Sequence, residues 1–486
     1  MGIVINQSIK NTLVTYLGFG IGAINVLFLF TNFLSDDYFG LITFILSTAN
    51  ILMPLMAFGT HNTIVKFYSV YKTKQSQNSF LLLMLFLPLF VIIPFGTIGY
   101  LAFDVISNWL SKENRLIKDY VWLIYITAIA FAYFEVFYAW AKVQMRSVFG
   151  NFMKEVFHRL ATGILLICLY FGFIEVTTLI YSITGVYILR MLIMKLYAYS
   201  LKRPSFKVHR IQGLGSILKY TSLIIIAGSV ATIILEIDKF MIGHYVPIKN
   251  VAYYGVAIYI ATVIGVPYRS LHQIASPLTA KYLNEKKTVE LHDLYQKSSL
   301  NLFIISGLIF LLIVVNVNQL YTLIPSAYSE GLFVVILISF AKLLDSLLGN
   351  NNAILFNSDY YRVVLLQGLL LTVLTITLNM VLIPKYGLNG SAVATFISIV
   401  VYNVIKISFV YRKFKMQPFS INTGKTFVLI LLCVALFYFW EFPFSSVLNI
   451  VLKSILVGGI YTTVVYKWQF SFDIVALLNK HIFNRF

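Results

Sequence analysis

Charged residues are scarce in this sequence, where Asp, Glu, Lys and Arg together make up 11% of 486 residues. A soluble domain carries about 25% charged residues. Hydrophobic residues reach 59%, and the mean hydropathy is +0.85. This composition excludes a water-soluble enzyme and a disordered chain. It leaves a polytopic membrane protein, in which each helical span needs roughly 20 mostly apolar residues.

Cysteine is also scarce, with Cys168 and Cys433 as its two positions, both in apolar stretches. No disulfide framework and no cysteine metal site follow from two such residues. The first apolar run lacks a small-residue cleavage pattern and is long enough to span a membrane. We therefore expect it to remain as the first helix rather than to act as a cleaved signal peptide.

Acidic residues are the scarcer charge, at 18 against 37 basic residues, which gives a formal net charge of +19. In a soluble protein this excess would suggest nucleic acid. In a membrane protein the simpler explanation is the enrichment of Lys and Arg in cytoplasmic loops. We therefore expect the lipid bilayer as a partner and no nucleic acid.

Long hydrophobic runs predict about fourteen transmembrane helices and an all-α fold. The predicted spans are 11–34, 38–64, 79–103, 120–142, 156–173, 176–199, 215–243, 250–279, 299–323, 331–356, 362–384, 388–411, 424–441 and 446–467.

The loops between these spans alternate between basic and base-poor. The basic loops contain the segments Lys66 to Lys74, Lys142 to Lys154, Lys202 to Lys219, Lys281 to Lys297 and Arg412 to Lys425. This alternation predicts that both termini are cytoplasmic. The longest loops, 104–119 and 284–298, leave no room for a soluble catalytic domain.

A weak internal repeat divides the chain. Ser8-Ile9-Lys10 before the first span corresponds to Ser216-Ile217-Leu218-Lys219 before the seventh, and Tyr38-Phe39-Gly40 corresponds to Tyr254-Gly255. The repeat predicts two pseudo-symmetric six-helix lobes, at 1–200 and 214–415, of the kind that handle substrate between them. A cytoplasmic linker would cover 201–213, and 416–486 would form two additional helices and a cytoplasmic tail.

Two motifs resemble those of the Wzx-type polysaccharide-repeat flippases, within the superfamily of multidrug, oligosaccharidyl-lipid and polysaccharide exporters. The first is LNMVLIPKYGLNGSAVAT at 378–395, and the second is EIDKFMIG at 236–243 followed by VAYYG at 251–255. Physically, the first motif predicts a tight outer corner. Pro384 would end a helix, and Gly387 and Gly390 would permit a reversal before small residues that allow close packing.

This resemblance implies a V-shaped protein with a central cavity between two lobes, in a bacterial inner membrane. It implies that the protein moves an undecaprenyl-diphosphate-linked oligosaccharide to the periplasmic leaflet by alternating access. O-antigen is one surface polysaccharide built from such units. A polysaccharide polymerase and other proteins of the pathway are expected partners.

A cavity that accepts a diphosphate should be cationic, because burying unpaired charge in a low dielectric is costly. Charged residues within spans are therefore candidates. The alternatives are snorkelling, ion pairing and ordinary packing. The candidate substrate-binding residues are Arg269, His272, Arg190, Lys406, Arg159, Lys342 and His61.

A second group of candidates would serve as a gate or in ion coupling. Glu236 and Lys239 have the spacing of a helical ion pair, as do Glu155 and Arg159, and Lys342 and Asp345. The alternative is that such pairs only lock the helices together. The candidate gate or coupling residues are Asp238, Glu236, Lys239, Glu135 and Asp345.

No metal site and no cofactor are expected, and a proton or sodium gradient is an expected source of energy. The segment Thr423-Gly424-Lys425-Thr426 resembles the end of a P-loop, but Phe419 stands where that motif requires glycine. The alternatives to a flippase are a drug/cation antiporter, a peptidoglycan-precursor flippase and, in another class, a membrane polysaccharide polymerase or glycosyltransferase.

Overall fold

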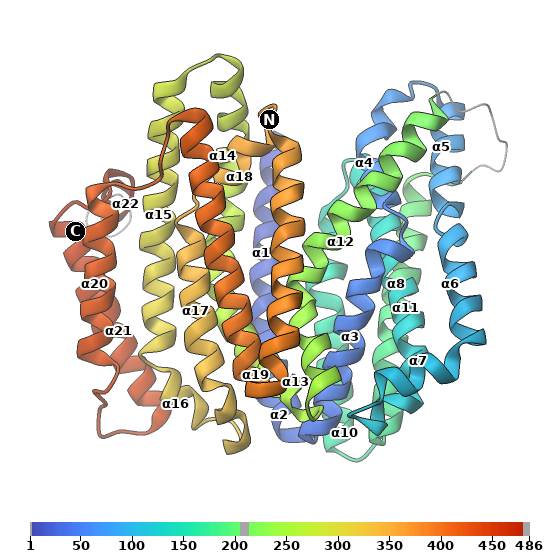
Figure 1. Ribbon diagram of the computed structural model, residues 1–486, viewed down its shortest axis with the longest axis horizontal. Coiled ribbons are helices and arrows are strands. Elements are labelled where there is room, and N and C mark those ends of the chain that lie inside the picture. The colour runs from blue at the N-terminus through green and yellow to red at the C-terminus, as the bar shows by residue number, and fades with distance from the viewer. Residues whose placement is uncertain (1, 205–212, 480–486) are drawn as a thin grey trace. The chain divides into compact units, whose positions relative to one another are not determined.

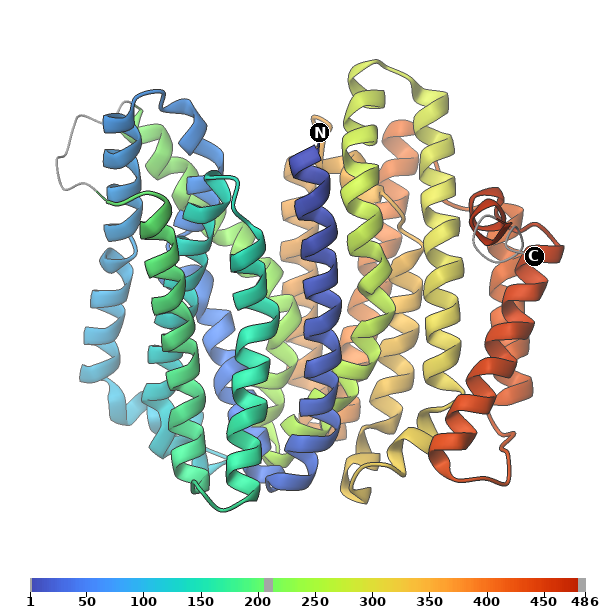
Figure 2. The same ribbon diagram turned by 180° about the vertical axis from the view of Figure 1, so that it is seen from behind.

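The computed structural model describes residues 2–204 and 213–479. Within these ranges the side chains of 2–6, 8–9, 226–227, 231, 269–270, 273–274 and 361 are not described. All regular elements of the described residues are helical (Figure 1, Figure 2). The chain forms two compact units, Met1–Ala252 and Tyr253–Phe486, called unit 1 and unit 2 below.

Unit 1 contains the following helices, in chain order: α1 (Gly2–Ile24), η1 (Asn25–Leu29), α2 (Phe30–Phe33), α3 (Asp36–Met56), α4 (Thr60–Phe67), η2 (Tyr68–Val70), α5 (Lys74–Phe86), α6 (Leu89–Leu101), α7 (Phe103–Leu110), η3 (Arg115–Tyr120), α8 (Val121–Val143), α9 (Val148–Phe152), η4 (Met153–Phe157), α10 (His158–Tyr170), α11 (Val176–Leu201) and α12 (Leu214–Tyr245). Helix α13 (Lys249–Thr262) crosses the boundary.

Unit 2 continues with η5 (Val263–Gly265), α14 (Val266–Asn284), α15 (Thr288–Val314), α16 (Val317–Tyr321), η6 (Ser326–Gly331), α17 (Leu332–Ser346), α18 (Asn351–Phe356), α19 (Tyr361–Phe414), α20 (Ile421–Phe437), α21 (Ser446–Lys467) and α22 (Phe472–Leu478). Of the described helices, ten are long and apolar enough to cross a membrane, and the bent helix α12 makes eleven. Each of the fourteen predicted spans overlaps described helices, so the predicted all-helical membrane fold is confirmed.

The core of unit 1 forms where α3, α8 and α12 pack together. Trp140 and Phe134 of α8 are fully buried, and the rings of Phe44 on α3 and Phe240 on α12 stack with centroids 5.7 Å apart. Thr63 of α4 also shares a hydrogen bond of 2.9 Å with Thr221 of α12. Helix α12 therefore packs within unit 1. The predicted lobes 1–200 and 214–415 follow the sequence repeat and stay a prediction.

The basic loops of unit 1 lie together at one end of its helices. Gln7 donates a hydrogen bond to the carbonyl of Met145 at 2.6 Å, and Lys202 donates to Gln77 at 2.6 Å. At the opposite end, Asn114 donates to the carbonyls of Gly243 and Val246 at 2.7 and 3.0 Å. The predicted inner and outer loops of unit 1 are thus separated as the alternation of charge requires.

Unit 2 has the same separation of loops. Gln296 bonds the carbonyl of Phe419 at 3.1 Å and so joins two predicted inner loops. Thr322 bonds Ser446 at 2.7 Å at the other end, among the predicted outer loops. The segment that resembles a P-loop begins α20, where Ser420 and Thr423 form a capping box. The residues Thr423 to Thr426 therefore serve as a helix start.

The 378–395 motif forms a sharp reversal within α19. Gly387 has φ 57° and ψ −137°, and a Cβ atom on Gly390 would lie 2.2 Å from the carbonyl oxygen of Leu382. Eight residues of straight helix would separate Leu382 from Gly390 by about 12 Å. The two halves of α19 therefore run back along each other, as Figure 1 shows. The predicted corner is confirmed, but Pro384 does not end the helix, because helical geometry continues to the residue before Gly387.

Helix α15 begins earlier than the predicted span at 299–323. It starts at Thr288, so the predicted loop 284–298 is mostly helical. Leu291 and Tyr295, four residues apart, are buried in a cluster with Ile354 and Val410. The early start was missed because this first stretch is amphipathic and held by packing, so its mean hydropathy is low.

Candidate functional site

The predicted site residues divide between the two units. Unit 1 holds His61, Glu135, Arg159, Arg190, Glu236, Asp238 and Lys239, and unit 2 holds Arg269, His272, Lys342, Asp345 and Lys406. Arg269 lies on α14, but its side chain is outside the described residues. Each unit gathers several of its candidates into a polar cluster.

In unit 1, Glu135 of α8 lies among bases from three elements. Its carboxylate pairs with the Lys154 ammonium of η4 at 2.6 Å, with the side chain of Glu135 14% exposed and that of Lys154 43%. Lys142 of α8 and His61 of α4 lie within electrostatic range of the same carboxylate. The Nδ1 atom of His61 is buried and has no hydrogen-bond partner within the described part of the chain. The structure thus gives Glu135 an ion-pair partner, Lys154, and its predicted gate or coupling role stays a prediction.

Arg190 of α11 is buried, with 7% of its surface exposed. Its guanidinium lies over three aromatic rings, at 4.2 Å from the centroid of Phe134, 4.8 Å from Tyr187 and 5.3 Å from Phe131. Cation–π contacts of this kind partly compensate for lost hydration. Among the described residues no carboxylate pairs with Arg190, and its buried Nε has no hydrogen-bond partner. Among the described residues, the guanidinium thus has aromatic neighbours and no anionic partner.

His158, at the start of α10, is a neighbour of Arg190 that the sequence analysis missed. Its ring lies 5.5 Å from that of Tyr187, the same ring that contacts Arg190, and its Nδ1 is a further buried atom that the described residues leave without a partner. A histidine in an apolar stretch is usually interpreted as a residue that packs in the core. Only the fold, which sets α10 beside α11, places it near Arg190.

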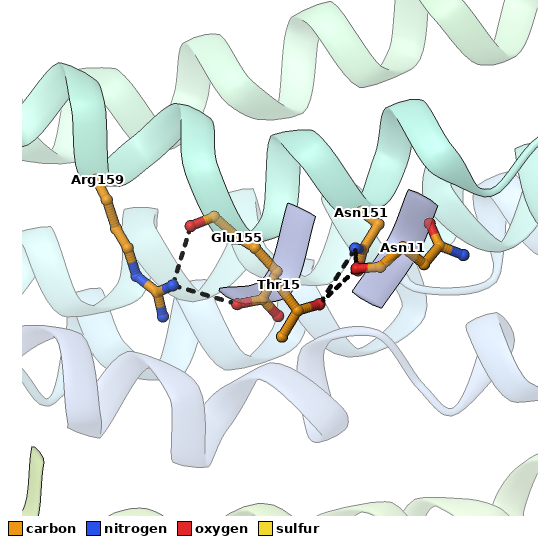
Figure 3. A network of polar contacts seen from close by, with 5 residues as sticks. All are labelled: Asn11, Thr15, Asn151, Glu155 and Arg159. Atoms are coloured by element: carbon orange, nitrogen blue, oxygen red, sulfur yellow. Dashed lines mark hydrogen bonds and ion pairs between the residues drawn. The ribbon is translucent and has the colours of Figure 1, made fainter. Parts of the chain in front are cut away.

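Arg159 has a different environment, as Figure 3 shows. Its Nη1 donates to the carbonyl oxygen of Glu155 at 3.0 Å and pairs with the carboxylate of Glu155 at 3.3 Å. Asn151 of α9 bonds Thr15 and the backbone of Asn11 on α1, at 3.4 and 3.0 Å. Asn151 thus ties α9 to α1, while Arg159 is paired with Glu155 of η4, and the predicted pairing of these two is confirmed.

Helix α12 carries the predicted gate residues. Lys239 and Glu236 form an ion pair, each with an 18% exposed side chain, and Asp238 is buried with 6% exposed. The predicted pairing of Glu236 and Lys239 is confirmed, whereas a gating or coupling role stays a prediction. Across the described residues, no group of three or more His, Cys, Asp or Glu could hold a metal ion.

In unit 2, Lys406 of α19 is completely buried and is held by a neutral amide. Its ammonium donates to Oδ1 of Asn352 on α18 and lies 4.5 Å from the ring centroid of Tyr402. Nδ2 of Asn352 donates to the Tyr268 hydroxyl of α14 at 2.9 Å, and the ring of His272 lies 5.8 Å from that of Tyr268. The fold therefore joins two predicted residues, Lys406 and His272, through two that were missed.

The acidic residue of this cluster is Asp345 of α17, which lies within electrostatic range of Lys406. Lys342, one turn earlier, is half-buried, and the ion pairs of the described residues include neither Lys342 nor Asp345. Lys342 and Asp345 therefore do not form the ion pair that their spacing predicted.

The break between α17 and α18 fixes Asn352 in place. Gly349 has φ 50°, and the next two residues each tie the break to another helix. Asn350 donates to Thr279 of α14 at 2.8 Å, and Asn351 donates to the Tyr295 hydroxyl of α15 at 2.7 Å. The run Gly349-Asn350-Asn351-Asn352 was the sequence signal for this cluster, because consecutive amides within an apolar span need partners.

Unit 1 also contains an apolar pocket of about 380 Å³. Its walls come from α3, α6, α7, α8 and α12 and include Leu52, Phe95, Trp122 and Phe240. Because the lining lacks charged side chains, this pocket does not suit a diphosphate. The candidate site is therefore assigned to the two polar clusters.

Comparison with known proteins identifies the fold and the family. The lipid II flippase MurJ in an inward closed conformation matches with a TM-score of 0.73 and 13% identity, over 95% of this chain and 100% of that chain. A multidrug resistance MATE family transporter in an inward-facing conformation matches with a TM-score of 0.60 and 12% identity, over 84% of this chain and 94% of that chain. An outward-facing MATE structure gives 0.57 and 13%, over 84% and 95%.

These likenesses establish the fold. Among curated protein sequences, none matches the chain. The family model described as "Polysaccharide biosynthesis protein" matches residues 5–283, which is more than half of the sequence. The resemblance carried by the motifs at 236–255 and 378–395 thus agrees with both the family and the fold, and this chain belongs to the polysaccharide biosynthesis protein family.

Proposed function

We propose that the protein is a flippase that moves an undecaprenyl-diphosphate-linked oligosaccharide from the cytoplasmic to the periplasmic leaflet of a bacterial inner membrane, for synthesis of a surface polysaccharide such as O-antigen. The family supports the polysaccharide, and the flippase and transporter fold supports the movement. The diphosphate is supported by the buried charges.

The observation that carries the proposal is the state of Arg190. A guanidinium in low dielectric normally pairs with a carboxylate or donates hydrogen bonds to several acceptors. Arg190 has aromatic rings around it and, among the described residues, no acceptor. A diphosphate supplies both the negative charge and acceptors for a bidentate contact. A drug antiporter would instead favour acidic residues that face its cationic substrates.

Position along the spans also supports the proposal. Glu135, Arg190 and Lys406 all lie in the halves of their spans nearer the predicted cytoplasmic loops. A headgroup arriving from the cytoplasmic leaflet would therefore meet these charges first. We propose the same orientation for the whole chain, with both termini cytoplasmic. Movement would follow by alternating access of two lobes around a central cavity.

Energy for the cycle would come from a proton or sodium gradient. Glu135 is the residue proposed for this role, because its carboxylate pairs with a partly exposed lysine and lies near other bases. A polysaccharide polymerase would act on the delivered units and is the proposed partner in the pathway.

A second candidate substrate is a peptidoglycan precursor such as lipid II. The specific observation in its favour is the TM-score of 0.73 with the lipid II flippase, the highest of the three structures described above. Both candidates are flippase substrates, so the two proposals share a transport mechanism and differ in the headgroup.

The test is a flipping assay with the purified protein in lipid vesicles. The probes are fluorescent polyprenyl diphosphate carrying N-acetylglucosamine, fluorescent lipid II, and the same polyprenyl chain without diphosphate. We expect a membrane-impermeant quencher to reach nearly all of the first probe when protein is present, and only its outer-leaflet share when protein is absent. Faster movement of lipid II would select the second candidate, and equal movement of the uncharged lipid would contradict both.

A further inference from the structure

Asn403 of α19 is a buried amide without hydrogen bonds. It is 6% exposed, and neither its Oδ1 nor its Nδ2 has a partner among the described residues. Leaving one buried polar atom unsatisfied costs stability, and here both ends of the same amide are unsatisfied. Such a group calls for a partner that donates and accepts at once.

Some buried polar groups of the same helix are satisfied, whereas Oε1 of Gln367 and Oγ of Ser391 also lack a partner among the described residues. Thr375 and Ser398 each donate to the carbonyl four residues earlier, at 2.8 and 2.7 Å. Asn350 of the α17–α18 break and Asn352 of α18 bond residues of other helices. Unpaired single atoms thus occur elsewhere in unit 2, but among its described buried amides Asn403 is the one whose oxygen and nitrogen are both unpaired.

The position of Asn403 relates it to Lys406. Residues three apart on a helix share a face, with Cβ atoms about 5–6 Å apart. The ring of Tyr402, the residue before Asn403, lies with its centroid 4.5 Å from the Lys406 ammonium. A ligand whose anion reaches Lys406 would therefore place its next few atoms within reach of Asn403.

We propose that Asn403 binds hydroxyl groups of the first sugar of the lipid-linked oligosaccharide, while the diphosphate of the same molecule lies at Lys406. This inference rests on the proposed function. Phosphate oxygens only accept hydrogen bonds and would leave Oδ1 of Asn403 unsatisfied. Sugar hydroxyls donate and accept, so they satisfy both ends of the amide. In the lipid-linked oligosaccharide, the first sugar is joined directly to the diphosphate. With the diphosphate at Lys406, that sugar would therefore lie close enough to contact Asn403, three residues earlier on the same helix.

The experiment measures binding of three probes to purified protein: farnesyl diphosphate, and farnesyl diphosphate bearing glucose or N-acetylglucosamine. For the wild-type protein we expect at least one sugar-bearing probe to bind about tenfold more tightly than the bare probe. Asn403→Leu should remove this preference and leave the affinity for bare farnesyl diphosphate unchanged. That unchanged affinity also reports that the variant is folded.

Two further variants serve as controls for Asn403→Leu. Asn403→Ser keeps a donor and acceptor and should retain part of the preference, whereas Ser398→Ala removes a buried hydroxyl already bonded within α19 and should retain all of it. Loss of the preference in Ser398→Ala as well would overturn the inference, as would a wild-type protein that binds the bare and sugar-bearing probes equally. An unchanged preference in Asn403→Leu would also overturn it, because a buried water would then account for the amide. Failure of the wild-type protein to bind any probe would instead contradict the proposed function.

Discussion

Arg190 in unit 1 and Lys406 in unit 2 are two buried cations kept in different ways. Arg190 is surrounded by the faces of three aromatic rings, whereas Lys406 is tethered to the oxygen of Asn352. An aromatic face attracts a cation but competes weakly for its N–H groups. A ligand can therefore bind Arg190 without displacing a hydrogen bond, but at Lys406 it must exchange with Asn352. Burial alone therefore does not determine how readily a charge binds a ligand.

The largest expected effect comes from removing the free cation. Arg190→Gln should weaken binding of farnesyl diphosphate by about 100-fold, because a buried charged contact to phosphate is worth several kcal/mol. Equilibrium binding to the purified variant measures this effect. Arg159→Gln is the matched control, since its guanidinium is already paired with Glu155. Equal losses in both variants would erase the distinction between free and paired arginines.

Substitution of the tethered cation, Lys406, should weaken binding less than substitution of Arg190, and it should not lower the stability of the protein. Lys406→Met keeps most of the side-chain volume and should weaken farnesyl diphosphate binding by about tenfold. The loss is modest because, in the wild-type protein, a phosphate that binds Lys406 must displace the hydrogen bond to Asn352. Removing a buried ammonium should leave the melting temperature unchanged or raise it by a few degrees. Thermal unfolding monitored with the binding assay measures both. A large fall in melting temperature would show that the Asn352 tether stabilises unit 2.

The smallest expected effect is at the ion pair of unit 1. Glu135→Gln should lower the free energy of unfolding by about 1 kcal/mol or less, because Lys154 is partly exposed and solvent screens the pair. The loss should shrink further at high salt. Thermal unfolding at two salt concentrations measures it, with Lys297→Gln, in a more exposed pair with Asp293, as the control. A salt-independent loss would assign Glu135 to a desolvated network instead.

The sequence predicted the spans and the intramembrane charges because both depend on local composition. The apolar runs could be found without knowing their neighbours, and Arg190 and Lys406 stood out against them. It could not predict what surrounds each charge. Whether Arg190 meets a carboxylate or three rings depends on α8 and α10 packing beside α11, which is a property of the fold.

The residues that the sequence analysis missed were mainly neutral polar ones. Asn352, Tyr268 and Asn403 carry no charge, so a search for charged residues within spans passes over them, although they determine how Lys406 is held and what could lie beside it. Lys453 of α21, which is 1% exposed, was a charge within a predicted span and could have been found by the same rule as Lys406. The corner at Gly387 shows the reverse case, where a short motif predicted a tertiary feature correctly.

The reversal in α19 has a consequence for how this protein is made. Residues 361–414 place two antiparallel helices side by side with the chain turning at Gly387 and no connecting loop. During synthesis, the first half cannot settle across the bilayer with an exposed end for long, since the second half follows at once. The pair should enter the membrane as one hairpin, and its insertion leaves the sidedness of every later segment unchanged.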